Sequence, residues 1–236
     1  MIAHIKSQHP FDQRTSFGNL EANIQFLKMN EVENIISKDK KMLEIGSGLG
    51  NLLNYLLDQG YDIQGTEIDP EYIDKSYKLY GKLPISLVAS EILPFDDKSF
   101  DIVMSFDVFE HIPDSDNHLK EVKRVLKDGG YYLLQTPNKY TSKPFELIRH
   151  KKLSAWNDDH ISLHGYKELI RRFHKNGMNL EFLDVHVVNN FFKSKIDRYT
   201  GKFGLSVLKV INPDKFPLNF RTNFYIRAGR NTFQHN

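Results

Sequence analysis

Apolar and polar positions follow two alternating patterns between residues 41 and 136. Short apolar runs, typical of buried strands, are separated by longer segments in which apolar residues recur at helical spacing. This order predicts a parallel β-sheet whose strands are connected by crossover helices. We expect strands at 41–45, 61–68, 85–90, 99–106 and 131–136, and helices at 51–60, 69–81 and 114–130.

Capping residues support two of these helices. Asp69 followed by Pro70 is typical of an N-cap and a first helical position, and Gly81 is a stop signal. The helix at 114–130 is expected to begin at its Asp-Ser-Asp and to end at its two final glycines.

The regular alternation ends after Thr136. Residues 137–160 form a long connection, and compact α/β domains keep such connections short unless they have a function. The segment 189–220 is aromatic and basic, and its pattern does not define its structure. The further elements that we expect are an amphipathic helix at 18–38 packed on the sheet, a helix at 165–177, and strands at 180–188 and 223–230.

The composition favours a single cytoplasmic domain that covers residues 1–236. With 236 residues, 40% hydrophobic and 26% charged, the chain is typical of one globular α/β domain. Its apolar runs are shorter than the ~18 residues of a membrane span, and its first residues lack the order of a signal peptide. It has no cysteine, which excludes disulfides and thiolate metal sites and fits a reducing compartment.

The net charge of +2 conceals an asymmetry. Residues 1–138 carry 14 Lys and Arg against 22 Asp and Glu, a net charge of −8, whereas residues 139–236 carry 18 against 8, a net charge of +10. Two interpretations stay open: the basic half meets an anionic partner, or its charges solvate an exposed C-terminal layer. The chain has no nucleic-acid-binding module, and we do not expect a nucleic-acid partner.

The strongest chemical signal is a glycine loop, G-x-G-x-G at 46–50, between a predicted strand and a predicted helix. In an open parallel sheet, ligands bind at the carboxyl ends of the strands, which is where this loop would lie. The spacing differs from the G-x-G-x-x-G of dinucleotide-binding proteins, and no lysine follows it as in a P-loop. Glu44, two positions before the loop, would repel a pyrophosphate but suits the ammonium of a ligand.

Glu67, at the end of the second predicted strand, is placed to accept hydrogen bonds from both ribose hydroxyls of an adenosine. The loop, Glu44 and Glu67 together call for an adenosine with a positively charged group and no required phosphate. S-adenosylmethionine has this composition.

Five blocks of the chain resemble one family. They are LEIGSGLGN, GTEIDPEYI, LPFDDKSFDIVMSFDVFEHIPD, VLKDGGYYLLQTPN and GYKELIRRFHKNGM. In this order they are similar to the class I S-adenosylmethionine-dependent methyltransferases, in particular to the broad group with LPF…FD…EH(I/V) blocks, from Met42 to Leu183. The resemblance implies a Rossmann-like fold, a seven-stranded mostly parallel sheet with helices on both faces.

The resemblance also implies how the domain is divided. Residues 1–40 would be a helical lead-in, 41–136 the cofactor-binding half, and 137–236 the acceptor-binding half. The acceptor-binding half would carry insertions at 137–160 and 189–220.

The resemblance further implies roles for individual residues. Glu67 would hold the ribose of S-adenosylmethionine, and Ile68 would pack on its adenine. Many relatives have an acidic residue where this chain has Ala89, so a side-chain bond to the adenine amino group is in doubt at that position. The residues expected to line the methionine end and the loop are Glu44, Gly46, Ser47, Gly48 and Gly50; those expected beside the adenine are Ser90 and Glu91; those expected to border the methyl-transfer site are Phe106, Asp107 and His111.

Methyl transfer requires mainly that the nucleophile, the methyl carbon and the sulfur are held in line. A base is needed only when the nucleophile carries a proton of high pKa, and histidine suits that role near neutral pH. His111, His160 and His164 are the catalytic candidates, in that order, although His111 also suits a packing role or a place beside the cofactor. The DDHISLH at 158–164 has metal-ligand residue types, but Gly165 argues against a helix there, and we predict no metal.

The identity of the methyl acceptor is less defined. The Asn/Asp-Pro-Pro-aromatic motif of many amino methyltransferases is absent after the fourth strand, where the chain has FDVF. The TPN at 136–138 and the basic, aromatic C-terminal region resemble methyltransferases of sugars, lipid-linked intermediates or other small metabolites. Our hypothesis is an O-methyltransferase for such an acceptor, which an anionic group would suit, with weak contact to a membrane surface as an option.

Two alternatives stay open. One is a catalytically silent module that binds S-adenosylmethionine. The other is an NAD-linked nucleotide-sugar oxidoreductase, which is disfavoured because the chain lacks both the G-x-G-x-x-G fingerprint and a Tyr-x-x-x-Lys pair.

Overall fold

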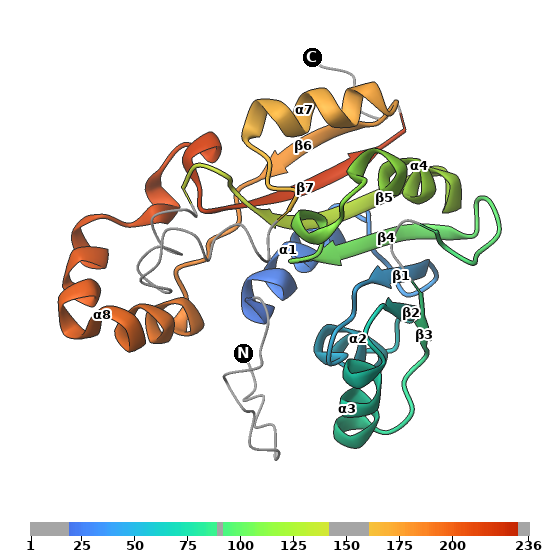
Figure 1. The fold of residues 1–236 in the computed structure, drawn as a ribbon, viewed down its shortest axis with the longest axis horizontal. Coiled ribbons are helices and arrows are strands. Elements are labelled where there is room, and N and C mark those ends of the chain that lie inside the picture. The colour runs from blue at the N-terminus through green and yellow to red at the C-terminus, as the bar shows by residue number, and fades with distance from the viewer. Residues whose placement is uncertain (1–18, 89–91, 142–160, 231–236) are drawn as a thin grey trace.

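A seven-stranded sheet forms the centre of the molecule (Figure 1). The structure, a computed structural model, describes residues 19–88, 92–141 and 161–230. The strand order is β3-β2-β1-β4-β5-β7-β6, and every neighbouring pair is parallel except the two pairs made by β7. The mostly parallel sheet predicted from the sequence is thus confirmed. The strands are β1 (Lys41–Ile45), β2 (Asp62–Glu67), β3 (Ile85–Leu87), β4 (Phe100–Phe106), β5 (Leu126–Pro137), β6 (Asn179–Leu183) and β7 (Asn223–Gly229).

The helices connect the strands at the positions that the sequence pattern indicates. Asp69 caps α3 by accepting a hydrogen bond from the Glu71 N–H at 2.8 Å, and Asp114 caps α4 by accepting one from the Asn117 N–H at 3.0 Å. The α-helices are α1 (Leu20–Val32), α2 (Asn51–Asp58), α3 (Pro70–Tyr80), α4 (Ser115–Val125), α7 (Tyr166–Lys175) and α8 (Asn190–Val210); the 3-10 turns are η1 (Phe109–His111), η2 (Pro213–Lys215) and η3 (Leu218–Phe220).

Alternate residues of the strands point to opposite faces of the sheet, and each face has its own core. On one face, Leu43 and Val103 pack in a cluster with residues of α4 and α7. On the other face, Met42 and Met104 pack with residues of α1 and α2. The molecule therefore has three layers, with the sheet between two layers of helices.

The boundary between α4 and β5 differs from the prediction. The helix ends at Val125, and the segment that we expected to complete it, Leu126–Gly130, is the start of β5. Leu126 is fully buried and pairs with Phe100 of β4, so tertiary pairing outweighs the local helix pattern. The glycines therefore lie within the strand and do not end the helix.

Two other elements are shorter than expected. The strand expected at 180–188 ends at Leu183, and the helix expected at 18–38 ends at Val32. The predicted packing of this helix on the sheet is confirmed, because Phe26 of α1 is fully buried and its ring lies 5.3 Å from that of Tyr225 in β7, centroid to centroid.

The segment 189–220, whose structure the sequence pattern did not define, contains α8, two helical stretches joined by a kink at Gly201, where φ is +62°. α8 leaves the body of the molecule and projects from one side of it (Figure 1). The chain enters this segment from the end of β6 and leaves it into the start of β7. Among the helices of the described residues, none is long and apolar enough to cross a membrane.

Phe26 offers a test of how α1 contributes to stability. Phe26→Ala should lower the free energy of unfolding by about 3–5 kcal/mol, because it removes a fully buried aromatic ring and leaves a cavity. The matched control is Val32→Ala on the same helix, which should change stability by less than about 0.5 kcal/mol because Val32 is 83% exposed. Urea unfolding measures both. Equal effects would show that α1 is not docked as described.

Candidate functional site

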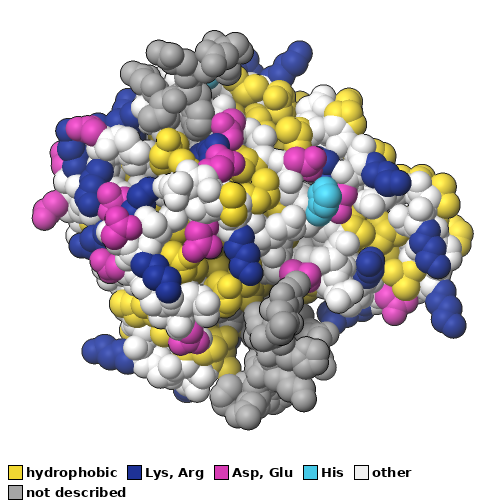
Figure 2. Space-filling view, turned by 180° about the vertical axis from the view of Figure 1, so that it is seen from behind, with side chains coloured by type: hydrophobic (Ala, Val, Ile, Leu, Met, Phe, Trp, Pro, Cys, Tyr) yellow, Lys and Arg dark blue, Asp and Glu magenta, His cyan; other side chains and the backbone are white. Residues whose placement is uncertain are grey.

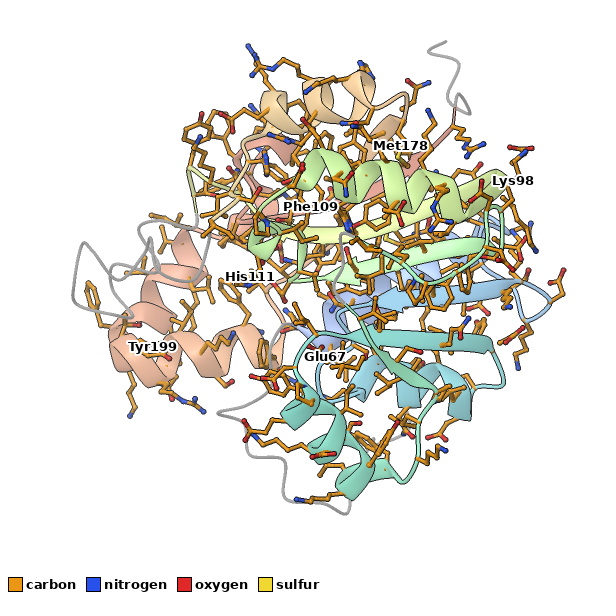
Figure 3. All side chains as sticks on the ribbon, turned by 45° about the vertical axis from the view of Figure 1, so that its right-hand side comes forward. Glu67, Lys98, Phe109, His111, Met178 and Tyr199 are labelled. Atoms are coloured by element: carbon orange, nitrogen blue, oxygen red, sulfur yellow. The ribbon has the colours of Figure 1, made fainter. Side chains whose placement is uncertain are left out.

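The carboxyl ends of the parallel strands meet at one edge of the sheet. β1 ends at Ile45 and leads into the glycine loop, β2 ends at Glu67, and β4 ends at Phe106. Figure 3 shows Glu67 and His111 on this side of the molecule, contributed by different segments. This is the edge at which open parallel α/β sheets bind their ligands.

The glycine loop is shaped by close neighbours at its ends. A Cβ at Gly46 would lie 2.5 Å from a methyl of Val108, and one at Gly50 would lie 2.6 Å from a methyl of Leu83. Gly48, between them, has no atom within 4 Å of the place where its Cβ would be. The outer glycines thus let the loop pack tightly against the protein, while the middle glycine leaves its backbone open to a ligand.

Glu67 holds this loop through hydrogen bonds to the backbone. One carboxylate oxygen accepts from the Gly48 N–H at 2.7 Å, and the other accepts from the N–H groups of Ile68 at 2.9 Å and Asp69 at 3.0 Å. The Glu67 side chain is buried, whereas Ile68 beside it is exposed. The carboxylate is therefore fixed in orientation, with an apolar surface next to it.

Glu44 lies on β1, beneath the loop, and is buried. Burial, and secondarily the negative charge of Glu67, raises the pKa of its carboxyl to about 8. Within the part of the chain that the structure describes, its Oε2 has no hydrogen-bond partner. A buried polar oxygen without a partner is costly, and a cationic donor from a ligand would satisfy it.

The end of β4 has an unusual backbone. Asp107 has a φ of +54°, which non-glycine residues rarely adopt. Its N–H donates to the side-chain oxygen of Gln135 at 2.9 Å, and the Gln135 amide in turn donates to Asn223 at 3.0 Å. Phe106, before it, is half-buried and meets the ring of Phe26 edge-on at 6.2 Å. The three neighbouring strands β4, β5 and β7 thus fix the direction of Asp107.

Glu110 is a buried carboxyl that the sequence analysis did not identify. Burial, and secondarily the charge of Asp107, raises its pKa well above the ordinary value. The Thr136 hydroxyl donates to it at 3.1 Å. The sequence does carry a signal for Thr136 and for Gln135: both are polar residues at the end of an apolar strand, and this strand lies next to β4, which ends just before Asp107.

The histidine candidates lie in different surroundings. His111, in η1, has an exposed side chain, and Figure 3 shows it on the side of the sheet edge from which α8 projects. His164 is buried, its ring lies 5.4 Å from that of Phe109, and burial lowers its pKa to about 4. The imidazole of His164 is therefore neutral at pH 7.

His164 lines a pocket of about 500 Å³ next to α4 and α7. None of the described residues expected to bind the cofactor lines this pocket, and neither does His111. The structure thus brings the described residues among the predicted cofactor residues and His111 to one edge, and His164 lies close to η1, against Phe109. Charged residues dominate the wall: Asp116, Lys139, Glu168, Arg171, Arg172 and Lys175.

Some of the predicted site residues lie outside the described residues. These are Ser90 and Glu91, which were expected beside the adenine, and His160, with its acidic neighbours at 158–159. Within the described ranges, no group of three His, Cys, Asp or Glu side chains is arranged to hold a metal ion.

Comparisons of the sequence with known proteins point to one activity. A family model described as a methyltransferase domain matches residues 43–134. The chain is 28% identical over 185 residues to the ubiquinone biosynthesis O-methyltransferase of Pelagibacter ubique. The aligned region covers 74% of this chain and 73% of the relative. It is 29% identical over 148 residues to the sterol 4-C-methyltransferase strm-1 of Caenorhabditis elegans, which covers 60% of this chain and 41% of the relative.

Solved structures share the fold. An S-adenosylmethionine-dependent methyltransferase from Mesorhizobium loti superposes with a TM-score of 0.59 at 10% identity, over 86% of this chain and 97% of that one. A methyltransferase from Methanosarcina mazei, also dependent on S-adenosylmethionine, superposes with a TM-score of 0.54 at 18% identity, over 85% of this chain and 97% of that one. The family match and the named relatives thus identify a methyltransferase domain in this chain, and its fold is one that S-adenosylmethionine-dependent methyltransferases share.

Proposed function

We propose that this methyltransferase transfers the methyl group to an oxygen atom of a small-molecule, sugar or lipid-linked acceptor. The observation that carries the proposal is the exposed imidazole of His111, four residues after Asp107. An imidazole there suits an acceptor whose hydroxyl must lose a proton. The O-methyltransferase named among the relatives supports the same chemistry.

We further propose that the donor binds along the loop, with its ribose on Glu67, its ammonium on Glu44 and its adenine against Ile68. The fit rests on two observations: the Glu44 Oε2 has no partner among the described residues, and the space next to Gly48 is open. S-adenosylmethionine, when bound, supplies an electrophilic methyl group on a sulfur that leaves readily. The loop and Glu67 fix the direction from which the acceptor must approach.

On the acceptor side, His111 takes the proton of the attacking hydroxyl. Because its side chain is exposed, the imidazole is accessible to an acceptor from solvent. The buried His164 is assigned no proton-transfer role in this proposal, because burial keeps it neutral and the pocket that it lines contains none of the proposed donor-binding residues. Phe106 and Asp107 border the position of the methyl group.

Transfer of a labelled methyl group tests the proposed function. The protein should move label from S-adenosylmethionine to one or more members of a panel of sugars, phenols and lipid-linked quinols. His111→Gln should slow transfer to a sugar hydroxyl by about 100-fold or more, the scale of a lost general base, and should slow transfer to a phenol less.

His174→Gln is the matched control for this assay. His174 is an exposed histidine near the end of α7, which leads to the opposite edge of the sheet, and its substitution should leave transfer unchanged. Binding of S-adenosylmethionine without transfer to any acceptor would favour a silent binding module, and label on nitrogen alone would contradict the oxygen assignment.

The ribose assignment can be tested by calorimetry with S-adenosylmethionine, S-adenosylhomocysteine and NAD. Glu67→Ala should weaken binding of both sulfur ligands by about 2–3 kcal/mol, the scale for lost hydrogen bonds to a charged group. This corresponds to roughly 30- to 150-fold in Kd. Glu71→Ala, a nearby exposed carboxylate on α3, is the control and should bind normally. Unchanged affinity in Glu67→Ala would contradict the assignment.

Glu44 should make stability depend on pH. In the unfolded chain its carboxyl ionises near 4.5, whereas in the folded chain it keeps its proton up to about pH 8 because its pKa is raised. The folded state therefore binds more protons in this window, and stability falls as the pH rises through it. Glu44→Gln should remove that loss, so the two proteins' free energies of unfolding diverge by a few kcal/mol between these limits. If the free energies of unfolding of the parent and of Glu44→Gln, measured in urea, changed in parallel with pH, the raised pKa of Glu44 would be refuted.

A further inference from the structure

α8 differs from the other helices because it buries none of its 21 residues. α4, about half as long, buries five side chains against the sheet. A helix of a globular protein is normally held by an apolar face on the core. α8 instead projects from the body (Figure 1), so its apolar residues need another explanation.

The second half of α8 carries an exposed apolar stripe. Phe203 is 78% exposed and Val210 is 85% exposed, and Val207 between them is also exposed. These residues are spaced by four and three positions, so they lie on one face of the helix. Ile211, directly after the helix, is also exposed, and so is Phe220 in η3.

Basic residues surround this stripe. α8 contains five Lys and Arg and a single acidic residue, Asp197. Lys202 and Lys209, each one position before a residue of the stripe, are exposed beside it. Figure 2, which views the molecule from behind, shows hydrophobic and basic side chains next to each other on the side where α8 lies. An apolar face flanked by lysines is typical of helices that lie in a membrane interface.

The base of α8 is fixed to the body. Asp214 accepts hydrogen bonds from the N–H groups of Val187 and Val188 at 2.9 and 3.0 Å, and the Arg221 guanidinium donates to Asp184 at 2.7 Å. Asn189 at the start of the helix donates to Asn19 at 2.7 Å. The chain is therefore held to the body of the molecule both before and after the helix that carries the exposed stripe.

We propose that the second half of α8 binds the surface of an anionic lipid bilayer. Phe203, Val207 and Val210 enter the interface, and Lys202 and Lys209 pair with anionic headgroups. The charge of the helix favours this occupant over a second copy of the chain, because two such helices would repel each other. This surface lies outside the proposed methyl-transfer site and does not depend on the acceptor.

Co-sedimentation with vesicles tests the proposal. The protein should bind vesicles of phosphatidylcholine with phosphatidylglycerol, should bind phosphatidylcholine alone much more weakly, and should be released by salt. The double variant Phe203→Ser, Val210→Ser should lose at least about tenfold in partitioning, because two apolar side chains no longer enter the interface. Lys202→Glu, Lys209→Glu should lose binding to the anionic vesicles selectively.

Val32→Ser is the matched control, since Val32 and Val210 are both exposed valines at the last position of a helix. It should bind vesicles like the parent, and all variants should keep their affinity for S-adenosylmethionine. Absence of vesicle binding by the parent would overturn the proposal, and so would equal binding by the double variant. If the parent sedimented as a dimer and did not bind vesicles, and the double variant Phe203→Ser, Val210→Ser sedimented as a monomer, the occupant would be a second copy of the chain.

Discussion

The carboxylate of Glu67 is the constraint on which the rest of the site depends. It accepts three backbone N–H groups, and one of them belongs to Gly48 in the middle of the loop. The loop after β1 and the end of β2 are therefore fixed to each other by a single charged group. The same charge lies near Glu44 and helps to hold a proton on it. The Glu67 carboxylate thus determines both the position of the glycine loop and part of the rise in the pKa of Glu44.

Acidic side chains come in pairs at this edge. Glu44 is influenced by Glu67, and Glu110 by Asp107, and in each pair burial raises the pKa of the first member. A cation brought between such groups would relieve repulsion that the protein maintains in its absence. The two positively charged groups of S-adenosylmethionine, its sulfonium and its ammonium, suit such a region. The acidic first half of the chain is consistent with this arrangement.

Much of the fold follows from the sequence because its signals are local. Asp69 and Asp114 cap the helices that they were expected to cap, and the glycine loop opens α2. The start of β5 at Leu126 could not be read in this way, since only its pairing with Phe100 of β4 distinguishes a strand from one more helical turn. Local patterns are weak where a tertiary partner decides the conformation.

The site shows the same division. Residues that follow a strand directly, such as Glu67 and Asp107, were identified because the parallel sheet places strand ends together. Gln135 was missed because its importance lies in a bond to the backbone of Asp107 from a strand 28 positions later in the chain.

The antiparallel placement of β7 has a consequence for how the molecule can change. Leu183 at the end of β6 pairs with Tyr225 near the start of β7, so these two antiparallel strands form a hairpin. Residues 184–222, which include α8, are the connection between its two strands. A hairpin tolerates loops of very different length at small entropic cost. The connection between β6 and β7 is therefore a place where evolution or protein engineering can exchange one segment for another while the half of the sheet that carries the glycine loop stays intact.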